Sequence, residues 1–255
     1  MNIIDFHVHP MYDFHLPTHG VTIDTTRFRA DLEQNGITRC CGSVIYSAMN
    51  NQPLEAYEQL IPKLNDQALL CREKMEGFYI PGIHVHPAFV DLSCRELQRC
   101  HEQGVKLIGE LVPYMMKWPE YTCDGFIEIM EYARELDMVV NMHPTTPADM
   151  FAFCEAVPKL KIVWAHLSGY NAFEEHLKML KRYENVYFDI SAHGLDRDAI
   201  LRYTIDQVGY ERLLFGTDYP GIGPAADIAG VMHEQLTTCE REAIFYKNAE
   251  RLLAL

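Results

Sequence analysis

The chain lacks the features that mark membrane, secreted and multidomain proteins. No run approaches the roughly 18 consecutive apolar residues of a membrane span, and the first residues enter a strand pattern without the basic and apolar regions of a secretory signal. No stretch rich in proline, glycine or serine interrupts the 255 residues. We therefore expect one domain over residues 1–255, in the cytoplasm and without a membrane partner.

Basic residues and several catalytic motifs are also scarce or missing. Lysine and arginine number 22 against 36 acidic residues, and the resulting formal charge of −14 disfavours binding to nucleic acid, which relies on clustered basic side chains. The sequence contains no G-x-S-x-G, G-x-x-x-x-G-K-[ST] or G-x-G-x-x-G, which argues against serine hydrolases, P-loop proteins and dinucleotide-binding proteins. None of the 8 cysteines forms a C-x-x-C pair, so we expect reduced thiols rather than disulfides.

Strand and helix patterns alternate eight times along the chain. The predicted strands are short and apolar, and they cover residues 2–7, 37–46, 78–85, 105–110, 138–143, 161–165, 185–189 and 212–217. Helical patterns between them include 26–34, 93–103, 124–136, 147–157, 171–182 and 196–207, with a capping box at Ser93 and Glu96 and helix-ending glycines at Gly36 and Gly104. Regular alternation over about 250 residues predicts a (β/α)8 TIM barrel. A doubly wound open sheet is the alternative.

Residue types that bind metals recur where the predicted strands end. His7 and His9 follow the first strand, and side chains at i and i+2 of a strand point the same way. Further candidates end later strands: Glu110, His143, His166 and Asp218. Barrel enzymes place their active sites at the carboxyl ends of strands. The sequence therefore predicts a metal site there.

Strand alternation assigns these side chains to the barrel interior. In the first strand, Ile3, Asp5, His7 and His9 share one face, and Ile4, Phe6 and Val8 share the face expected to pack on helices. The same counting places inward the residues Lys106, Ile108 and Glu110, then Asn141 and His143, then Trp164 and His166, then Gly216 and Asp218.

With these residues the chain resembles the amidohydrolase superfamily, in particular its amidohydrolase-related branch and the TatD-like hydrolases. The motifs that carry the resemblance span nearly the whole chain: Asp5-Phe6-His7-Val8-His9, His143, His166, Phe215-Gly216-Thr217-Asp218-Tyr219-Pro220 and Asn248-Ala249-Glu250-Arg251-Leu252-Leu253. The resemblance implies a distorted barrel that holds one or two divalent ions, usually zinc, with manganese or iron as alternatives.

The resemblance also implies roles for single residues. His7 and His9 would bind the buried ion, and Asp218 would be both a ligand and the proton-transfer group. His143 and His166 would bind a second ion, or would divide into one ligand and one catalytic histidine. Glu110 corresponds to the glutamate that bridges two ions in TatD-like enzymes, whereas Lys106 lies too deep to be a bridging lysine. The alternative for Glu110 is an ion pair with a nearby histidine or arginine.

Other polar residues near strand ends are weaker candidates. His84 and His86 form a second H-x-H, for which substrate contact or support of the ligands is favoured over direct ligation. Asp189 and His193 follow the seventh strand. They could orient His166 or contact the substrate, or they could be a helix cap and a surface histidine. His166 or His193 could stabilise a developing oxyanion.

Two long loops after predicted strands are expected to shape a substrate pocket. They cover residues 11–24, with Tyr12, Phe14, His15 and His19, and residues 111–123, with Tyr114, Lys117, Trp118 and Tyr121. Lys117 or Arg197 could bind a substrate carboxylate or phosphate, although most such side chains are simply solvated.

The favoured function is hydrolysis of a carboxylic ester, lactone, amide or phosphodiester in a small molecule by water that a metal ion activates. The alternatives are a metal-dependent non-oxidative decarboxylase of an aromatic acid and a non-catalytic metal-binding protein. The bridging position of Glu110 and the short chain count against the decarboxylase. Self-association into a homo-oligomer stays open, and the sequence does not name the substrate.

Overall fold

The computed structural model describes residues 1–11, 23–50, 52–118, 120–169, 172–195 and 197–255, and of residues 193 and 194 it describes the backbone alone. Eight strands form one sheet. They are β1 (Ile4–Asp5), β2 (Arg39–Ser43), β3 (Tyr79–Ile83), β4 (Leu107–Leu111), β5 (Val139–Met142), β6 (Lys161–Trp164), β7 (Val186–Asp189) and β8 (Leu213–Leu214).

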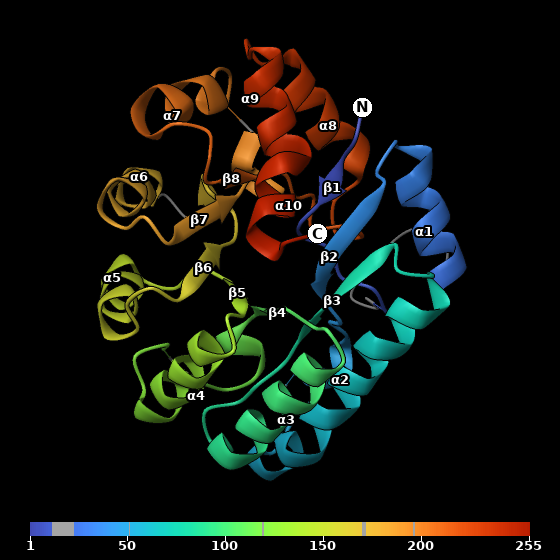
Figure 1. Cartoon of the computed structure of the whole chain (residues 1–255), viewed down its shortest axis with the longest axis vertical. Helices are drawn as coiled ribbons and strands as arrows, with labels where there is room; N and C mark the ends of the chain where they lie inside the picture. The colour runs from blue at the N-terminus through green and yellow to red at the C-terminus, as the bar shows by residue number, and fades with distance from the viewer. Residues whose placement is uncertain (12–22, 51, 119, 170–171, 196) are drawn as a thin grey trace.

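The strands pair in parallel and in sequence order from β1 to β8 (Figure 1). Backbone hydrogen bonds close the ring between its ends, because Phe6 N donates to Phe215 O at 2.8 Å and His9 N donates to Tyr219 O at 2.8 Å. The predicted (β/α)8 barrel is confirmed. The alternative of a doubly wound open sheet is wrong, since such a sheet keeps two free edges.

Helices surround the strands (Figure 1). They are α1 (Thr25–Gln34), α2 (Tyr57–Lys74), α3 (Val90–Glu102), α4 (Asp124–Glu135), α5 (Pro147–Ala156), α6 (Phe173–Arg182), α7 (Ile200–Val208), α8 (Pro224–His233), α9 (Thr238–Glu242) and α10 (Asn248–Leu253). Short turns of other helix types cover Ser47–Met49, Leu54–Ala56, Pro113–Met115, Ala192–Leu195 and Ala243–Lys247.

One of the two predictions about helix ends is confirmed and the other is wrong. Gly36 and Gly104 follow α1 and α3 with φ of 80° and 81°, as expected of glycines that end helices. The capping box at Ser93 and Glu96 is wrong, because α3 already begins at Val90 and the Ser93 hydroxyl donates to the carbonyl of His86.

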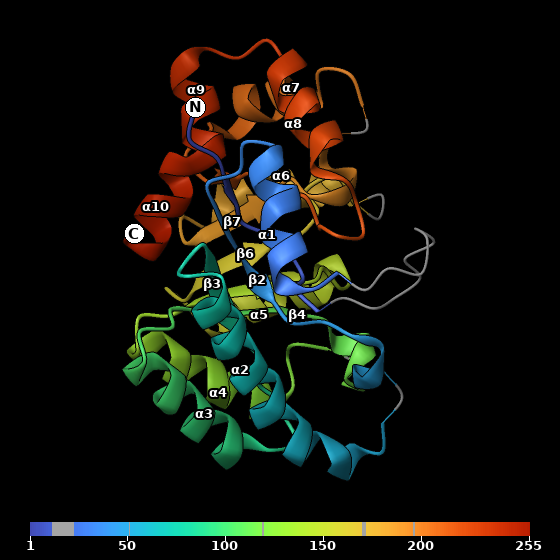
Figure 2. The same ribbon diagram turned by 90° about the vertical axis from the view of Figure 1, so that its right-hand side faces the viewer.

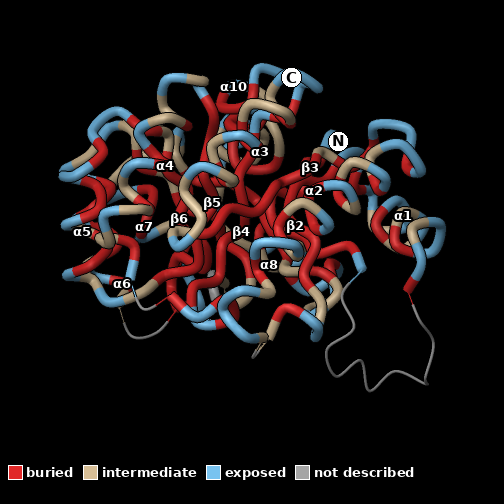
Figure 3. Tube along the Cα trace, turned by 90° about the horizontal axis from the view of Figure 1, so that it is seen from below, coloured by how far each residue is buried: buried red, intermediate tan, exposed pale blue. Residues whose placement is uncertain are grey.

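The apolar core has two main layers. The inner cluster joins Ile4 and Phe6 to Leu107, Val139 and further strand residues, and α10 closes it from the amino end of the barrel. The outer cluster fills the space between strands and helices. Figure 2 shows both chain termini at the end of the barrel where α10 lies, and Figure 3 shows buried chain running through the centre of the molecule. The candidate site described below lies at the opposite end of the barrel.

Strand alternation predicted the facing of side chains only in part. Ile4 and Phe6 belong to the inner cluster rather than to the helix-facing one, whereas Ile108 and Trp164 pack in the outer cluster. The physical reason is irregular backbone. The chain bends at Phe6, directly after β1, and the register of β4 against β5 shifts between Ile108 and Leu111. The period-two rule fails wherever a strand is interrupted in this way.

Two smaller expectations concern membranes and thiols. Among the described residues, no helix is both long and apolar enough to cross a bilayer. All 8 cysteines are free, as expected from their spacing.

Close contact between strands generates the first prediction. A Cβ on Gly82 in β3 would lie 1.8 Å from Gly109 O of the neighbouring strand and 2.9 Å from Gly42 O. Because both obstacles are backbone atoms, Gly82→Ala should lower the free energy of unfolding by about 3 kcal/mol, measured as a lower urea midpoint.

Gly223→Ala is the matched control. A Cβ there meets nothing within 4 Å, and the change should cost less than about 1 kcal/mol as a helix N-cap substitution. Equal urea midpoints for the two variants would contradict the proposed steric crowding at Gly82.

Candidate metal centre

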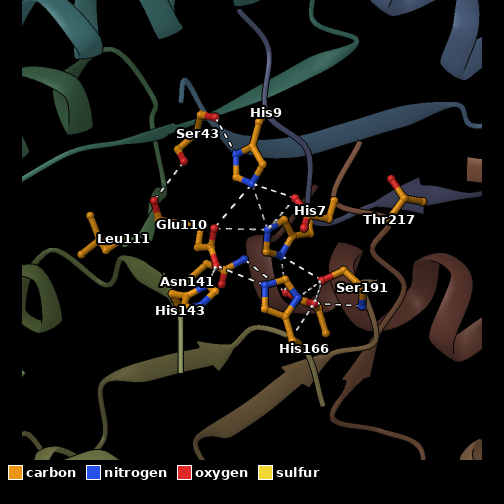
Figure 4. A network of polar contacts seen from close by, with 12 residues as sticks. His7, His9, Ser43, Glu110, Leu111, Asn141, His143, His166, Ser191 and Thr217 are labelled. Carbon is orange, nitrogen blue, oxygen red and sulfur yellow. Dashed lines mark hydrogen bonds and ion pairs between the residues drawn. The ribbon is translucent and has the colours of Figure 1, made fainter. Parts of the chain in front are cut away.

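Four imidazoles and two carboxylates converge at the carboxyl end of the barrel. Figure 4 shows His7, His9, Glu110, His143 and His166 pointing toward a common centre from strands that are far apart in the sequence. These five residues are between 0% and 8% exposed. Asp218 completes the set from the chain after β8, and its side chain is 27% exposed. The structure therefore brings together all six residues predicted as ligands.

One half of the cluster contains His7, His9 and Asp218. The Nε2 atoms of His7 and His9 lie 3.1 Å apart. Asp218 Oδ1 is 3.3 Å from His9 Nε2 and 3.9 Å from His7 Nε2. These three side chains form a group of donors that could hold a metal ion.

Glu110 stands between this group and a second one. Its Oε2 atom lies 3.4 Å from His7 Nε2 and 3.5 Å from His9 Nε2. Its Oε1 atom lies 2.9 Å from His143 Nδ1 and 3.7 Å from His166 Nε2. Glu110, His143 and His166 form a second group that could hold an ion. The two carboxylate oxygens thus face two different sets of imidazoles.

Unusual backbone conformations direct these side chains inward. Gly109 has a φ of 84°, and a Cβ there would lie 2.1 Å from Asn141 O, so only glycine fits directly before Glu110. His166 and Asp218 adopt φ of 59° and 66°, which is rare outside glycine. Such conformations cluster at functional sites.

Each of three imidazoles is anchored through its Nδ1 atom. His7 Nδ1 donates to Asp189 Oδ2 at 2.9 Å and His9 Nδ1 donates to Ser43 O at 3.1 Å. His166 Nδ1 lies 2.9 Å from Ser191 Oγ, whose hydroxyl donates to Asp189 Oδ1. These acceptors assign the proton to Nδ1, which leaves the Nε2 lone pairs facing the centre.

The charges of the cluster fit divalent cations. Two buried nitrogen lone pairs 3.1 Å apart repel each other unless a proton or a cation lies between them. Burial lowers the pKa of His9, but hydrogen bonds to Asp218 and Glu110 outweigh it and raise that pKa to about 9. Burial raises the pKa of Glu110, yet the imidazoles of His7 and His143 hold it well below its usual range. Nitrogen and carboxylate donors of this kind suit zinc, manganese or iron.

Asp5 has a positioning role that the sequence did not reveal. It is fully buried, its Oδ1 accepts from His7 N at 3.2 Å and Thr217 N at 3.0 Å, and its Oδ2 accepts from the Thr217 hydroxyl at 2.6 Å. It therefore ties the end of β1 to the end of β8. Burial raises its pKa to about 7, despite the hydrogen bonds from Thr217.

The contacts of Ser43 and Ser191 with the imidazoles were also not predicted from the sequence. Ser43 supplies a carbonyl and Ser191 a hydroxyl, and neither group carries a signal in a single sequence. The place of Ser191 two residues after Asp189 at the end of β7 is the one available hint.

The second histidine pair lies beside the cluster rather than in it. His84 Nε2 lies 2.9 Å from Val44 O, and burial lowers the pKa of this histidine to about 4. His86 was predicted to contact the substrate, but its Nε2 bonds to Met116 O at 2.8 Å and its Nδ1 accepts from Ala88 N. His86 does not line the cavity described below, because both ring nitrogens serve the fold of nearby loops.

The remaining candidate substrate-binding and catalytic residues lie in different places. Tyr114 lines the cavity, whereas Lys117 is exposed and does not line it. Asp189 is fully buried and contacts His7 instead of facing the cavity, since its carboxylate is used as an anchor. The side chain of His193 lies outside the described residues, as do Tyr12, Phe14, His15 and His19. Arg197 belongs to a separate depression near α7 and α8.

Comparison with known proteins identifies the family. The family model described as "Amidohydrolase" matches residues 4–255. The chain belongs to the amidohydrolase family. Dihydroorotase from Helicobacter pylori (strain HPAG1) is 28% identical over 122 residues, and the match covers 41% of this chain and 34% of the dihydroorotase. The chain thus aligns with about a third of that relative's length.

Solved structures share the fold of this amidohydrolase. A 2,6-dihydroxybenzoate decarboxylase from Rhizobium has a TM-score of 0.77 at 17% identity, with 99% of this chain and 98% of that chain covered. A dihydroxybenzoic acid decarboxylase from Polaromonas with bound manganese has a TM-score of 0.74 at 16% identity, with 100% and 98% covered. Since nearly all of both solved chains is covered, chain length does not separate this protein from decarboxylases.

Anchoring of His7 by Asp189 generates a prediction. Asp189→Asn removes the charge that holds the Nδ1 proton of His7 and sets an amide against donors from Ser191 and His166. The affinity for zinc or manganese should fall about 10–100-fold, measured by titration calorimetry.

Asp198→Asn, at an exposed position after β7, should leave the metal affinity unchanged. Thermal unfolding of the metal-free proteins separates a loss of ligand geometry from a loss of fold. Unchanged metal affinity in a folded Asp189→Asn protein would mean that the anchor is unimportant.

Proposed function

We propose that this amidohydrolase is a metal-dependent hydrolase that cleaves a carboxylic ester, lactone, amide or phosphodiester in a small molecule, using two divalent ions. The observation that carries the proposal is the position of Glu110, whose two oxygens face separate sets of imidazoles. A carboxylate can span ions about 3.5–4 Å apart, the usual separation in two-metal sites.

The proposed ligands divide between the two groups. His7, His9 and Asp218 would hold one ion and His143 and His166 the other, with Glu110 shared. Ions held there would supply an activated water at neutral pH and would polarise the scissile carbonyl or phosphoryl group. Zinc is the expected metal, with manganese and iron as alternatives.

Asp218 is proposed as the group that moves the proton. Burial raises the pKa of its carboxyl, but the hydrogen bond to His9 and the neighbouring imidazoles outweigh it and lower that pKa below the ordinary value. The carboxylate is therefore ionised at neutral pH. It lines the cavity, where it can accept a proton from water and deliver it to the leaving group.

His166 is better suited to ligation than to stabilising an oxyanion. Its Nδ1 proton is directed to Ser191, and burial together with the charge of His7 lowers its pKa. A neutral ring in this tautomer offers a lone pair at Nε2 and no hydrogen there to donate. The catalytic role considered for His166 thus gives way to its role as a ligand.

A decarboxylase of an aromatic acid is the second candidate. It is favoured by the names of the solved structures that share the fold, although identities of 16–17% speak for fold alone. One ion would be enough for that reaction in the relatives that the sequence resembles. The number of ions that Glu110 contacts therefore separates the two candidates. A purely metal-binding role is disfavoured because the donors other than the buried His7 border an open cavity.

Metal stoichiometry tests the role of Glu110. Crystals soaked in excess manganese should show two anomalous peaks per chain with Glu110 between them. Glu110→Gln removes a charge that both ions would share, so calorimetry should show about tenfold or greater weakening of at least one of two sites.

Glu131→Gln, an exposed change on α4, is the matched control and should retain both sites. A single peak in the wild-type protein, with Glu110 hydrogen-bonded elsewhere, would favour the one-metal decarboxylase.

Loss of the proton acceptor gives a separate prediction. Asp218→Asn keeps the shape of the side chain but cannot take a proton, so kcat on the best substrate of an ester, lactone, amide and phosphodiester panel should fall by about 10² or more. The metal content of the variant is measured in the same samples. Asp91→Asn, an exposed change on α3, should keep normal turnover. Near-normal kcat in metal-loaded Asp218→Asn would refute the proposed proton transfer.

A further inference from the structure

The cavity above the cluster contains information about the substrate. It has a volume of about 280 Å³, which is below the range typical of pockets for drug-sized ligands. His9, Glu110, His143, His166 and Asp218 line the part nearest the cluster. The described residues that line the rest are Ile45, Asn50, Val112, Tyr114 and Met115.

Among the described residues, the outer part of this cavity is lined by no lysine or arginine. Its described lining residues are three apolar side chains, one amide and one phenol. A carboxylate or phosphate located away from the metal centre would lose water there without gaining a charged partner among the described lining residues. Burying an unpaired anion is strongly unfavourable.

The apolar wall of the cavity is packed firmly. Ile45, Val112 and Met115 are only 3–6% exposed and belong to one hydrophobic cluster with α2. The hydroxyl of Tyr57 in α2 donates to Met49 O at 2.9 Å and lies 3.1 Å from Met115 O, which joins the two loops that form the wall. The wall is therefore formed before substrate binds.

Uncharged polar contact comes from Asn50 and Tyr114 among the described lining residues. Asn50 is partly buried at the end of a short helical turn, Ser47–Met49, and its amide can both donate and accept a hydrogen bond. Tyr114 is 69% exposed and packs edge-on against His143 at 5.4 Å. These groups suit a substrate with a neutral polar substituent.

We infer that the substrate is a small neutral acyl compound, an ester, lactone or amide whose substituents are uncharged and largely apolar. This inference rests on the proposed hydrolase and narrows it. It disfavours acyl compounds that carry a further carboxylate or phosphate away from the scissile group, because that second charge would have no charged partner among the described residues of the outer part of the cavity.

Binding of a matched pair of hydroxamates tests the inference without turnover. Hexanohydroxamate and its analogue with a terminal carboxylate in place of the last methyl both carry the same metal-binding group. With manganese-loaded protein, calorimetry should show the neutral compound binding at least about tenfold more tightly. Equal or tighter binding of the carboxylated compound would overturn the inference.

Asn50→Lys adds the missing positive charge to the cavity. It should shift the ratio of the two affinities toward the carboxylated hydroxamate by about tenfold or more. Asn2→Lys, an exposed change at the opposite end of the barrel, is the matched control and should leave the ratio unchanged. An unchanged ratio in folded Asn50→Lys would show that this wall does not contact the substrate, against the inference.

Turnover of a neutral ester, lactone and amide panel by the same preparation separates the two claims. Preference for the neutral hydroxamate without any turnover would count against the hydrolase and leave the charge selectivity of the cavity intact. Turnover without preference for the neutral compound would support the hydrolase and overturn the charge selectivity.

Discussion

The site depends on how the far side of each imidazole is held. A buried histidine presents a lone pair to a cation only if its other ring nitrogen keeps the proton. Asp189, the carbonyl of Ser43 and the hydroxyl of Ser191 accept that proton from His7, His9 and His166. With a cation in place of the Nε2 protons, these three rings would be neutral and would direct their Nε2 lone pairs toward the ion, beside Glu110 and Asp218.

Closure of the barrel supplies the second requirement. His9 and Asp218 are 209 positions apart, yet backbone bonds and the Asp5 carboxylate join the ends of β1 and β8 and bring them to 3.3 Å. The contact is made where both strands lose regular geometry. In a regular strand, side chains two positions apart face the same way. Because Ile108 and Trp164 pack toward the helices, the ligands two positions after each of them would also face the helices if the strands stayed regular.

Family membership and chemistry are different statements for this protein. Decarboxylases share the barrel over nearly its whole length at 16–17% identity, and a barrel of this type supports many reactions through the side chains at its carboxyl end. The feature on which we base the proposed choice of hydrolase over decarboxylase is local: a glutamate after Gly109 faces two sets of imidazoles. The outer wall, formed by loops packed on α2, bears on substrate choice independently of that glutamate.

The sequence by itself determined the barrel, the family and the six candidate ligands. Alternating apolar strands and helices are a local signal, and H-x-H, His143, His166 and the Gly-Thr-Asp segment at 216–218 are recognisable by type and order. Tertiary structure alone decided the rest. Bends and contacts between distant segments turn Ile108 and Trp164 toward the helices and bring Ser43 and Ser191 to the imidazoles. Such contacts also let Asp5 join the ends of β1 and β8, and they hold His86 outside the cavity. Such contacts produce no periodic pattern in a single sequence, because the role of a serine, a carbonyl or an aspartate depends on the residues near it in space and not on those near it in the sequence.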